Sequence, residues 1–174
     1  MAAARRIVLT GGPGAGKTTL LDELARRGFP IVPEAARAVL RQAGGLDLRA
    51  KDPDGFAEAI LKRELERFEI AEPGEGAVFF DRGLGDLASM PVSDSGLRAR
   101  IADALASHRY DNPVFRAPAW NKIYCQDYER TQSWEEAVAS DMAVTAAWKA
   151  AGYAIIDLPP LTPEERADFV LALI

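Results

Sequence analysis

Cysteine and histidine are almost missing from this sequence, which has one residue of each among its 174. A single cysteine excludes a disulfide framework within the chain and a zinc site built from several thiolates. A single histidine excludes a metal site that needs two or more imidazoles. Any metal ion that the chain binds is therefore expected on oxygen ligands.

Long apolar runs and an excess of positive charge are missing as well. The apolar runs are far shorter than the roughly 18 residues of a membrane span, and residues 1–6 carry two arginines but no apolar signal region. The 21 basic and 26 acidic side chains give a net charge of −5, so charge does not favour nucleic acid as a partner. We expect a cytoplasmic protein that acts on neither membranes nor nucleic acid.

The composition that is present is that of a globular protein. Apolar residues make up 48 % and charged residues 27 % of the sequence, which is typical of a chain that folds around a core. The length suits one domain, and no internal repeat, low-complexity tract or long linker divides the chain. Residues 1–174 are therefore expected to form a single domain.

Short apolar strands alternate with helices along the sequence. Helix ends are marked by Gly28 and by capping boxes at Ser133 and Thr162. The expected strands are 6–10, 29–33, 77–81, 113–117 and 153–157. The expected helices are 17–27, 34–42, 52–71, one capped by Ser95, and those following Ser133 and Thr162. This alternation predicts βαβ units, a parallel sheet and an α/β/α sandwich of three layers.

One choice in this assignment stays open. The fourth strand could lie at 123–125 instead of 113–117, and we prefer the latter, which leaves 118–132 as a charged loop before the next helix. In that helix, apolar spacing predicts one buried face. Its expected members are Trp134, Val138, Met142, Thr145 and Trp148.

The segment Gly11-x-x-x-x-Gly16-Lys17-Thr18 has the P-loop pattern and stands between an expected strand and an expected helix. Its glycines let successive backbone N–H groups point at phosphate oxygens, with the helix dipole behind them. Lys17 is expected to reach the β- and γ-phosphates, and the Thr18 hydroxyl suits Mg²⁺. The strand–loop–helix context disfavours a chance glycine-rich turn. The predicted nucleotide-binding residues are Gly11, Gly12, Pro13, Gly14, Ala15, Gly16, Lys17, Thr18 and Thr19.

Asp81 ends the expected third strand after four apolar residues. A carboxylate in this place lies at the carboxyl edge of a parallel sheet, beside the phosphate loop, where it can serve Mg²⁺. The alternative is a strand-end aspartate that caps the next turn. Arg82 follows directly and is predicted either to contact the substrate or to form a structural ion pair.

Glu34 follows the second strand and is expected at the same edge of the sheet. A carboxylate there could accept the proton of an attacking hydroxyl. Arg37 would share its helix face and could hold an anionic group of a substrate. The alternative for Glu34 is a helix-start residue that the helix dipole favours.

Two further segments are candidates for covering a bound substrate. The charged loop 118–132 contains Arg130, and an arginine in such a loop can close over phosphates and neutralise charge during transfer. The amphipathic helix 52–71 is predicted to cover a substrate or, alternatively, to dock a protein partner. For loop 118–132 the alternative is an ordinary solvated surface.

Four segments resemble the bacterial AAA-domain predicted ATPases, which are small P-loop proteins related in pattern to nicotinamide riboside kinase and nucleoside kinase domains. They are RIVLTGGPGAGKTTLLDELARRGFPIVPEAAR at 6–37, FFDRGLGD at 79–86, VFRAPAWNKIYCQDYER at 114–130 and GYAIIDLP at 152–159. The resemblance implies a kinase-like core with five parallel strands in the order 2-3-1-4-5, and binding of ATP or GTP with Mg²⁺. It implies that Lys17 and Thr18 serve the nucleotide, Asp81 the metal and the segment around Arg130 a lid.

The resemblance also has a limit. Nucleoside kinases use a glutamate after the second strand as a base, and Glu34 matches it, but they carry an acidic-Arg-Ser triplet where this sequence has Asp81-Arg82-Gly83. The substrate of those kinases is therefore not transferred to this chain. Two functions are predicted: an ATP-dependent phosphotransferase acting on a small hydroxylated metabolite, or a nucleotide-dependent switch or slow ATPase with a protein partner. They differ in whether Glu34 and Arg37 face an enclosed cavity or an open surface.

Overall fold

A computed structural model describes residues 5–71, 76–120 and 133–174, and within them five parallel strands form one sheet. The strand order is β2-β3-β1-β4-β5, which confirms the kinase-like order that the sequence resemblance implied. The strands are β1 (Arg5–Gly11), β2 (Ile31–Val32), β3 (Ala77–Asp81), β4 (Val114–Ala117) and β5 (Ile155–Asp157).

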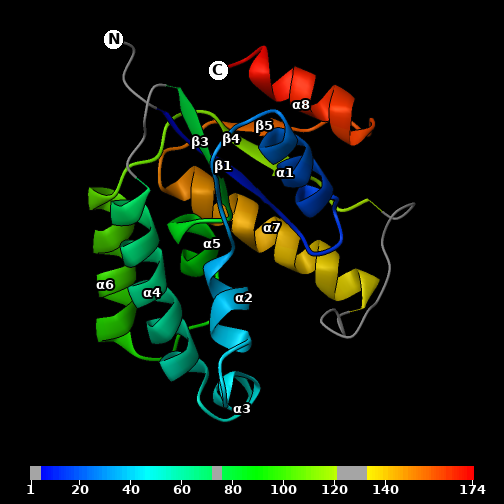
Figure 1. Cartoon of the computed structure of the whole chain (residues 1–174). Helices are drawn as coiled ribbons and strands as arrows, with labels where there is room; N and C mark the ends of the chain where they lie inside the picture. The colour runs from blue at the N-terminus through cyan, green and yellow to red at the C-terminus, as the bar shows by residue number, and fades with distance from the viewer. Residues whose placement is uncertain (1–4, 72–75, 121–132) are drawn as a thin grey trace.

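Helices cover both faces of this sheet, so the predicted three layers are confirmed (Figure 1). Helices α1 and α8 pack on one face, whereas α4, α5, α6 and α7 lie on the other. None of the helices in the described ranges is long and apolar enough to cross a membrane. The helices are α1 (Lys17–Arg26), α2 (Ala35–Leu40), α3 (Gly45–Lys51), α4 (Pro53–Ile70), α5 (Leu84–Ala88), α6 (Ser95–Ser107), α7 (Trp134–Ala150) and α8 (Pro163–Leu171).

The central strands are apolar on both faces because each face is covered by helices. In β1, Ile7 and Leu9 pack toward α1 and α8, whereas Val8 packs toward the opposite layer, and all three are fully buried. The opposite layer contains a run of aromatic rings in edge-to-face contact, a favourable geometry. Ring centroids lie 5.2 Å apart for Phe80–Tyr110, 5.6 Å for Tyr110–Trp148 and 4.9 Å for Trp148–Tyr153.

The expected element boundaries were wrong where elements are short. The helix expected at 34–42 ends at Leu40, and helices α3 and α5 lie in segments that had no predicted structure. Helices of five and seven residues show too little of the 3.6-residue period to be recognised in a sequence. The strands expected at 29–33 and 153–157 are shorter because β2 and β5 pair along one side only, at the edges of the sheet.

The buried face of α7 is displaced from the predicted one. Ala137, Asp141 and Val144 are buried, whereas Met142, which was expected in the core, is 66 % exposed. The displacement arises because Asp141 is buried in an ion pair with Arg116 of β4, with nitrogen and oxygen 2.8 Å apart. The prediction that Trp148 belongs to the core is confirmed, since its side chain is fully buried.

The helix caps agree with the sequence except at α6. The capping boxes of Ser133 with Glu136 and of Thr162 with Glu165 are present. At α6 the capping residue is Asp94, whose side chain accepts a hydrogen bond from the Leu97 backbone N–H, and not the expected Ser95. The aspartate is one residue earlier, and its carboxylate is a favoured acceptor at this position.

Replacing the true cap should cost stability where replacing its neighbour does not. Asp94→Ala is expected to lower the free energy of unfolding by about 1 kcal/mol, because the Leu97 N–H loses its acceptor. Ser95→Ala, at an exposed first helical position, should change it by less than about 0.5 kcal/mol. Chemical denaturation of both variants measures the difference, and equal losses would contradict this assignment of the cap.

Candidate active site

The carboxyl ends of the parallel strands bring the predicted site residues to one edge of the sheet. Asp81 at the end of β3 is in register with Leu9 of β1, two residues before the phosphate loop begins. Glu34 follows β2, which pairs with β3 on its other side. These segments surround a cavity of about 1330 Å³, called the central cavity below.

Most of the residues predicted from the sequence line the central cavity. They are Pro13, Gly14, Ala15, Gly16, Lys17, Thr18, Thr19, Glu34, Arg37, Asp81 and Arg82. Gly11 and Gly12 lie behind this lining, where their carbonyl groups contact Lys17. Arg130 lies outside the described residues, as do the other residues between 121 and 132, so its predicted role is not placed.

The phosphate loop keeps its shape through glycine and through the lysine that follows. A Cβ atom on Gly11 would lie 2.1 Å from the carbonyl oxygen of Ala117 in β4, so only glycine fits there. The Lys17 ammonium donates hydrogen bonds to the carbonyl oxygens of Gly11 at 3.2 Å and Gly12 at 2.7 Å. The lysine therefore folds back over the loop at the start of α1.

The Lys17 ammonium lies in an unfavourable place for a positive charge. Its residue is only 7 % exposed. Burial, and next the charge of Arg82, lower the pKa of Lys17 to about 7, although Asp81 and Glu34 act in the opposite direction. An anion bound in the loop would supply the missing negative charge and restore the ammonium form.

Asp81 has an oxygen without a partner in the part of the chain that the structure describes. Its Oδ1 atom is buried there and accepts no hydrogen bond. Burial and the charge of Glu34 raise the pKa of Asp81, against the opposing effect of Lys17. A hard cation would satisfy this oxygen, so the donor set fits Mg²⁺, with the exposed Thr18 as a second oxygen ligand. Within the described ranges no group of three or more Asp, Glu, His or Cys residues could hold a metal by itself.

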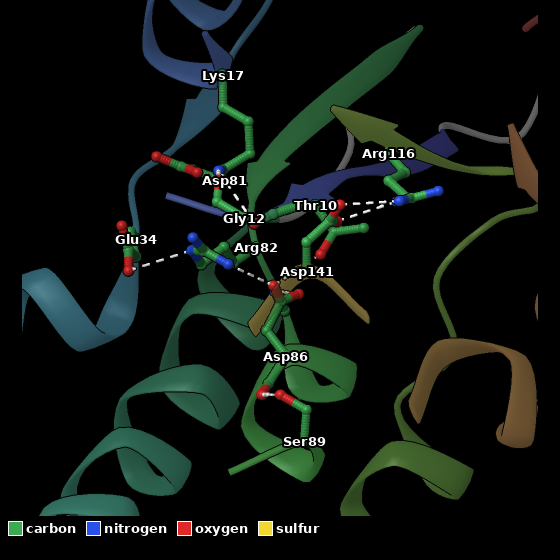
Figure 2. A network of polar contacts seen from close by, with 12 residues as sticks. Thr10, Gly12, Lys17, Glu34, Asp81, Arg82, Asp86, Ser89, Arg116 and Asp141 are labelled. Carbon is green, nitrogen blue, oxygen red and sulfur yellow. Dashed lines mark hydrogen bonds and ion pairs between the residues drawn. The ribbon is translucent and has the colours of Figure 1, made fainter. Parts of the chain in front are cut away.

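Arg82 lies between two carboxylates (Figure 2). Its Nε is 3.3 Å from Glu34 Oε1, and its Nη1 donates to Asp86 Oδ1 at 2.8 Å. Burial opposes the charge of Arg82, but Glu34, Asp86 and Asp81 outweigh it and raise the pKa of this guanidinium. Its backbone has φ 62°, which non-glycine residues adopt only at some cost.

Asp86, which was not predicted, holds this arrangement together. Its Oδ1 accepts hydrogen bonds from Thr10 Oγ1 at 2.7 Å and from Arg82. Its Oδ2 accepts from the Gly83 backbone N–H at 3.2 Å and from Trp148 Nε1 at 3.0 Å. The only signal in the sequence was an acid three residues after Gly83, at the spacing of a capping box.

Glu34 is directed into the site and does not cap its helix. It occupies the N-cap position of α2, yet its side chain makes no capping hydrogen bond. Its Oε2 lies 3.7 Å from Arg37 Nε, and its Oε1 faces Arg82. The two predicted residues Glu34 and Arg37 thus share one face, as expected, and both line the central cavity.

Three further cavity residues were missed in the sequence. Arg166 of α8 donates to the carbonyl oxygen of Ala15 at 3.1 Å, and its guanidinium carbon lies 5.0 Å from the centre of the Trp120 ring. Glu64 of α4, which lies on the other face of the sheet from α8, also lines the cavity and is 3 % exposed. Trp120 lies in the loop and Glu64 in the helix that the sequence predicted to cover a substrate, but none of the three was singled out, because none belongs to a recognised motif.

Removing the charge of Asp86 should lower the stability of the protein. Asp86→Asn leaves the buried Arg82 with a weaker partner and turns an amide nitrogen toward N–H or O–H donors. The free energy of unfolding should fall by about 3 kcal/mol, as for a broken buried pair. Asp47→Asn, in a pair with Lys51 that is 74 % exposed on both sides, should lose less than about 0.5 kcal/mol. Denaturant unfolding measures both, and similar values would show that the Asp86 network is not stabilising.

Comparisons with known proteins agree with this architecture. The model of the AAA domain family matches residues 6–166. Comparison with curated proteins finds no match. A NadR protein in complex with NR superposes with a TM-score of 0.75 at 19 % identity, over 98 % of this chain and 51 % of that chain.

Two other solved structures cover both chains almost fully. Deoxyadenosine kinase from M. mycoides with bound dATP has a TM-score of 0.70 at 14 % identity, over 97 % of this chain and 98 % of that chain. Shikimate kinase from Aquifex aeolicus has a TM-score of 0.57 at 15 % identity, over 96 % and 94 %. Identities this low show a shared fold, which is that of P-loop kinases. The family match extends over nearly the whole sequence, and the chain therefore belongs to the AAA domain family, with a kinase-like P-loop fold.

Proposed function

We propose that the protein transfers the γ-phosphoryl group of ATP to a hydroxyl group of a small metabolite. The observation that carries the proposal is that Lys17, Asp81 and Glu34 line one cavity of about 1330 Å³. Ligand cavities usually measure roughly 300–1,000 Å³, so this one has room for a nucleotide and a second molecule. Phosphoryl transfer requires such a pair of neighbouring sites.

The nucleotide is assigned to the phosphate loop and the start of α1. The loop residues 11–19 would bind the phosphates through backbone N–H groups, and Lys17 would place its charge on the β- and γ-phosphates. Trp120 and Arg166 line the cavity near Ala15 and would contact the base or the sugar. Solved structures of the same fold contain dATP or AMP-PNP, which supports ATP as the donor, with GTP as the alternative.

Thr18 and Asp81 would hold Mg²⁺ together with phosphate oxygens. A bound Mg²⁺ ion would neutralise part of the phosphate charge during transfer. The assignment rests on the unsatisfied Asp81 Oδ1 and on the position of Thr18 in the cavity lining.

Glu34 is assigned as the base for the acceptor. The acceptor oxygen would form the new bond to the γ-phosphorus while the bond to the β–γ bridging oxygen breaks, and the hydroxyl proton would pass to a Glu34 carboxylate oxygen. ADP would leave with the bridging oxygen. Arg82 and Arg37 flank Glu34, so they would orient it, and Arg37 could also hold an anionic group of the acceptor.

The alternative is a nucleotide-dependent switch or slow ATPase that acts through a protein partner. Such a protein needs the same phosphate loop but no acceptor space beside Glu34. The position of Glu34 and Arg37 in the cavity lining favours the phosphotransferase. The predicted roles of Arg130 and loop 118–132, and the single domain over residues 1–174, stay predictions.

Nucleotide binding should take up a proton above neutral pH. In the free protein the pKa of Lys17 is about 7, so at pH 8 most of the lysine is neutral, whereas bound phosphates would raise its pKa and favour the ammonium. MgATP binding should therefore take up about 0.9 proton at pH 8 and fewer near pH 6, where the lysine is already charged. Calorimetric titration in buffers of different ionisation enthalpy measures this, and no uptake at pH 8 would refute it.

The base assignment is tested by Glu34→Gln. The amide keeps the size of the side chain but cannot take a proton, so transfer should fall by roughly 10²–10⁴-fold with little change in nucleotide affinity. Arg37→Ala should mainly raise the KM for the acceptor. The acceptor comes from a screen of nucleosides, vitamins and sugars with γ-labelled ATP.

The matched control is Glu66→Gln, which removes a carboxylate from a side chain that is 43 % exposed and paired with Arg63 on the surface of α4. It should leave transfer unchanged. Normal transfer by the Glu34→Gln protein would rule out Glu34 as the base. Slow phosphate release that no compound in the screen accelerates would favour the switch.

A further inference from the structure

Helix α4 presents a short stripe of side chains to the central cavity. Phe56, Ile60 and Glu64 follow one another at intervals of four residues, which places them on one face of the helix. All three line the cavity, with 4 %, 2 % and 3 % of their surface exposed. The wall formed by α4 is therefore apolar along two helical turns and ends in a carboxyl group.

Among the residues described, one oxygen of the Glu64 carboxyl group has a hydrogen-bond partner and the other has none. Its Oε1 accepts a hydrogen bond from Arg67 Nη1 at 2.8 Å. Its Oε2 is buried without a partner. Burial raises the pKa of Glu64 to about 7, although the charge of Arg67 acts against this. A buried polar atom normally has a partner, and a ligand in the cavity would provide one.

Arg67 fixes the direction of this free oxygen. Besides Glu64, its guanidinium donates to the carbonyl oxygens of Val32 and Asp81, both at 3.2 Å. These carbonyls lie at the ends of β2 and β3, beside the residues assigned to catalysis. The bound half of the Glu64 carboxyl group is thus held against the sheet, and its Oε2 atom is the half left without a partner among the described residues.

The charges near Glu64 limit what that ligand can be. Glu34 and Asp86 are close enough to disfavour its ionised form, so a carboxylate or phosphate would meet repulsion here. A hydrogen-bond donor at Oε2 would instead stabilise the ionised carboxylate and be accepted by it. Phe56 and Ile60 beside it offer apolar surface that suits a flat ring.

We propose that Glu64 determines the specificity for the acceptor by accepting a hydrogen bond from an exocyclic amino group of a heterocyclic ring at its Oε2 atom. The acceptor class is a nucleoside-sized molecule whose ring carries such an amino group and packs on Phe56 and Ile60. This inference rests on the proposed function, since it presumes an acceptor site beside Glu34. It assigns the ring of the acceptor to α4 and the reacting hydroxyl to Glu34.

Glu64→Gln tests the inference without removing the contact to Arg67. The amide oxygen can still accept from Arg67, while an NH₂ group replaces the free oxygen and becomes a donor. The probes are two pairs, adenosine with inosine and cytidine with uridine, in which an amino group is replaced by an oxo group. Their affinities are measured by calorimetry on the protein saturated with AMP-PNP and Mg²⁺.

The wild-type protein should bind the amino member of at least one pair about tenfold or more tightly than the oxo member. In Glu64→Gln this preference should disappear or reverse, because the new donor suits an oxo group. Glu66→Gln, on the same helix but outside the cavity lining, should behave as the wild type. Glu64→Asp withdraws the carboxylate by one methylene and should weaken binding of the amino member alone, so it serves if Glu64→Gln does not fold.

Three results would overturn the inference: equal affinities for both members of each pair, equal weakening of both members in Glu64→Gln, or no binding of any of the four probes. Transfer from γ-labelled ATP, measured in parallel, separates this inference from the proposed function. An amino preference that depends on Glu64, without any transfer, would keep the ring-binding site and refute the phosphotransferase. Transfer to acceptors that carry no amino group, without an amino preference in binding, would keep the phosphotransferase and refute the ring-binding site.

Discussion

The carboxylate of Asp86 is the group on which the rest of the site depends. It joins β1 through Thr10, the turn after β3 through Arg82 and Gly83, and α7 through Trp148. These segments are far apart in the sequence, and one buried anion satisfies a donor from each. The Arg82 side chain is only 17 % exposed, so its guanidinium needs a fixed anionic partner. The contact of its Nη1 with Asp86 leaves the Arg82 Nε facing Glu34.

The charges around this anion do not balance one another fully within the protein. Lys17 is buried with carbonyl groups as its hydrogen-bond partners, and Asp81 has a buried oxygen without any. Phosphate groups would provide an anionic partner for Lys17, and a cation would provide a partner for the Asp81 oxygen. The free site therefore stores unfavourable electrostatic free energy that binding of a metal–nucleotide complex would release, which favours the complex over either component alone.

The sequence predicted what short motifs determine and missed what distant contacts determine. Asp81 ends β3, Glu34 follows β2, and Lys17 begins the helix after the loop that follows β1. Parallel strands bring their carboxyl ends together, so the common location of these residues followed from local pattern and topology. Asp86 could not be recognised in this way, because Thr10 and Trp148 lie 76 and 62 positions away from it.

Burial of charge explains the other differences. In α7, Asp141 lies on the buried face because Arg116 neutralises it, and a count of apolar positions then selects the wrong face. In α4, the sequence predicts an amphipathic helix, whose charged side chains are expected in solvent, although Glu64 is only 3 % exposed. A single sequence does not tell a buried charge from a solvated one, since the partner that permits burial comes from another element or another turn.

Helix α4 uses one residue to anchor itself to the sheet and others to line the cavity. Arg67 anchors the helix to the ends of β2 and β3, whereas Phe56 and Ile60 contact the cavity and take no part in that anchor. Substitutions in the stripe can therefore change the shape and polarity of the cavity wall without removing this anchor, although Phe56 and Ile60 also belong to the buried core of their layer. The wall of the cavity and the attachment of its helix to the sheet thus depend on different residues of one helix.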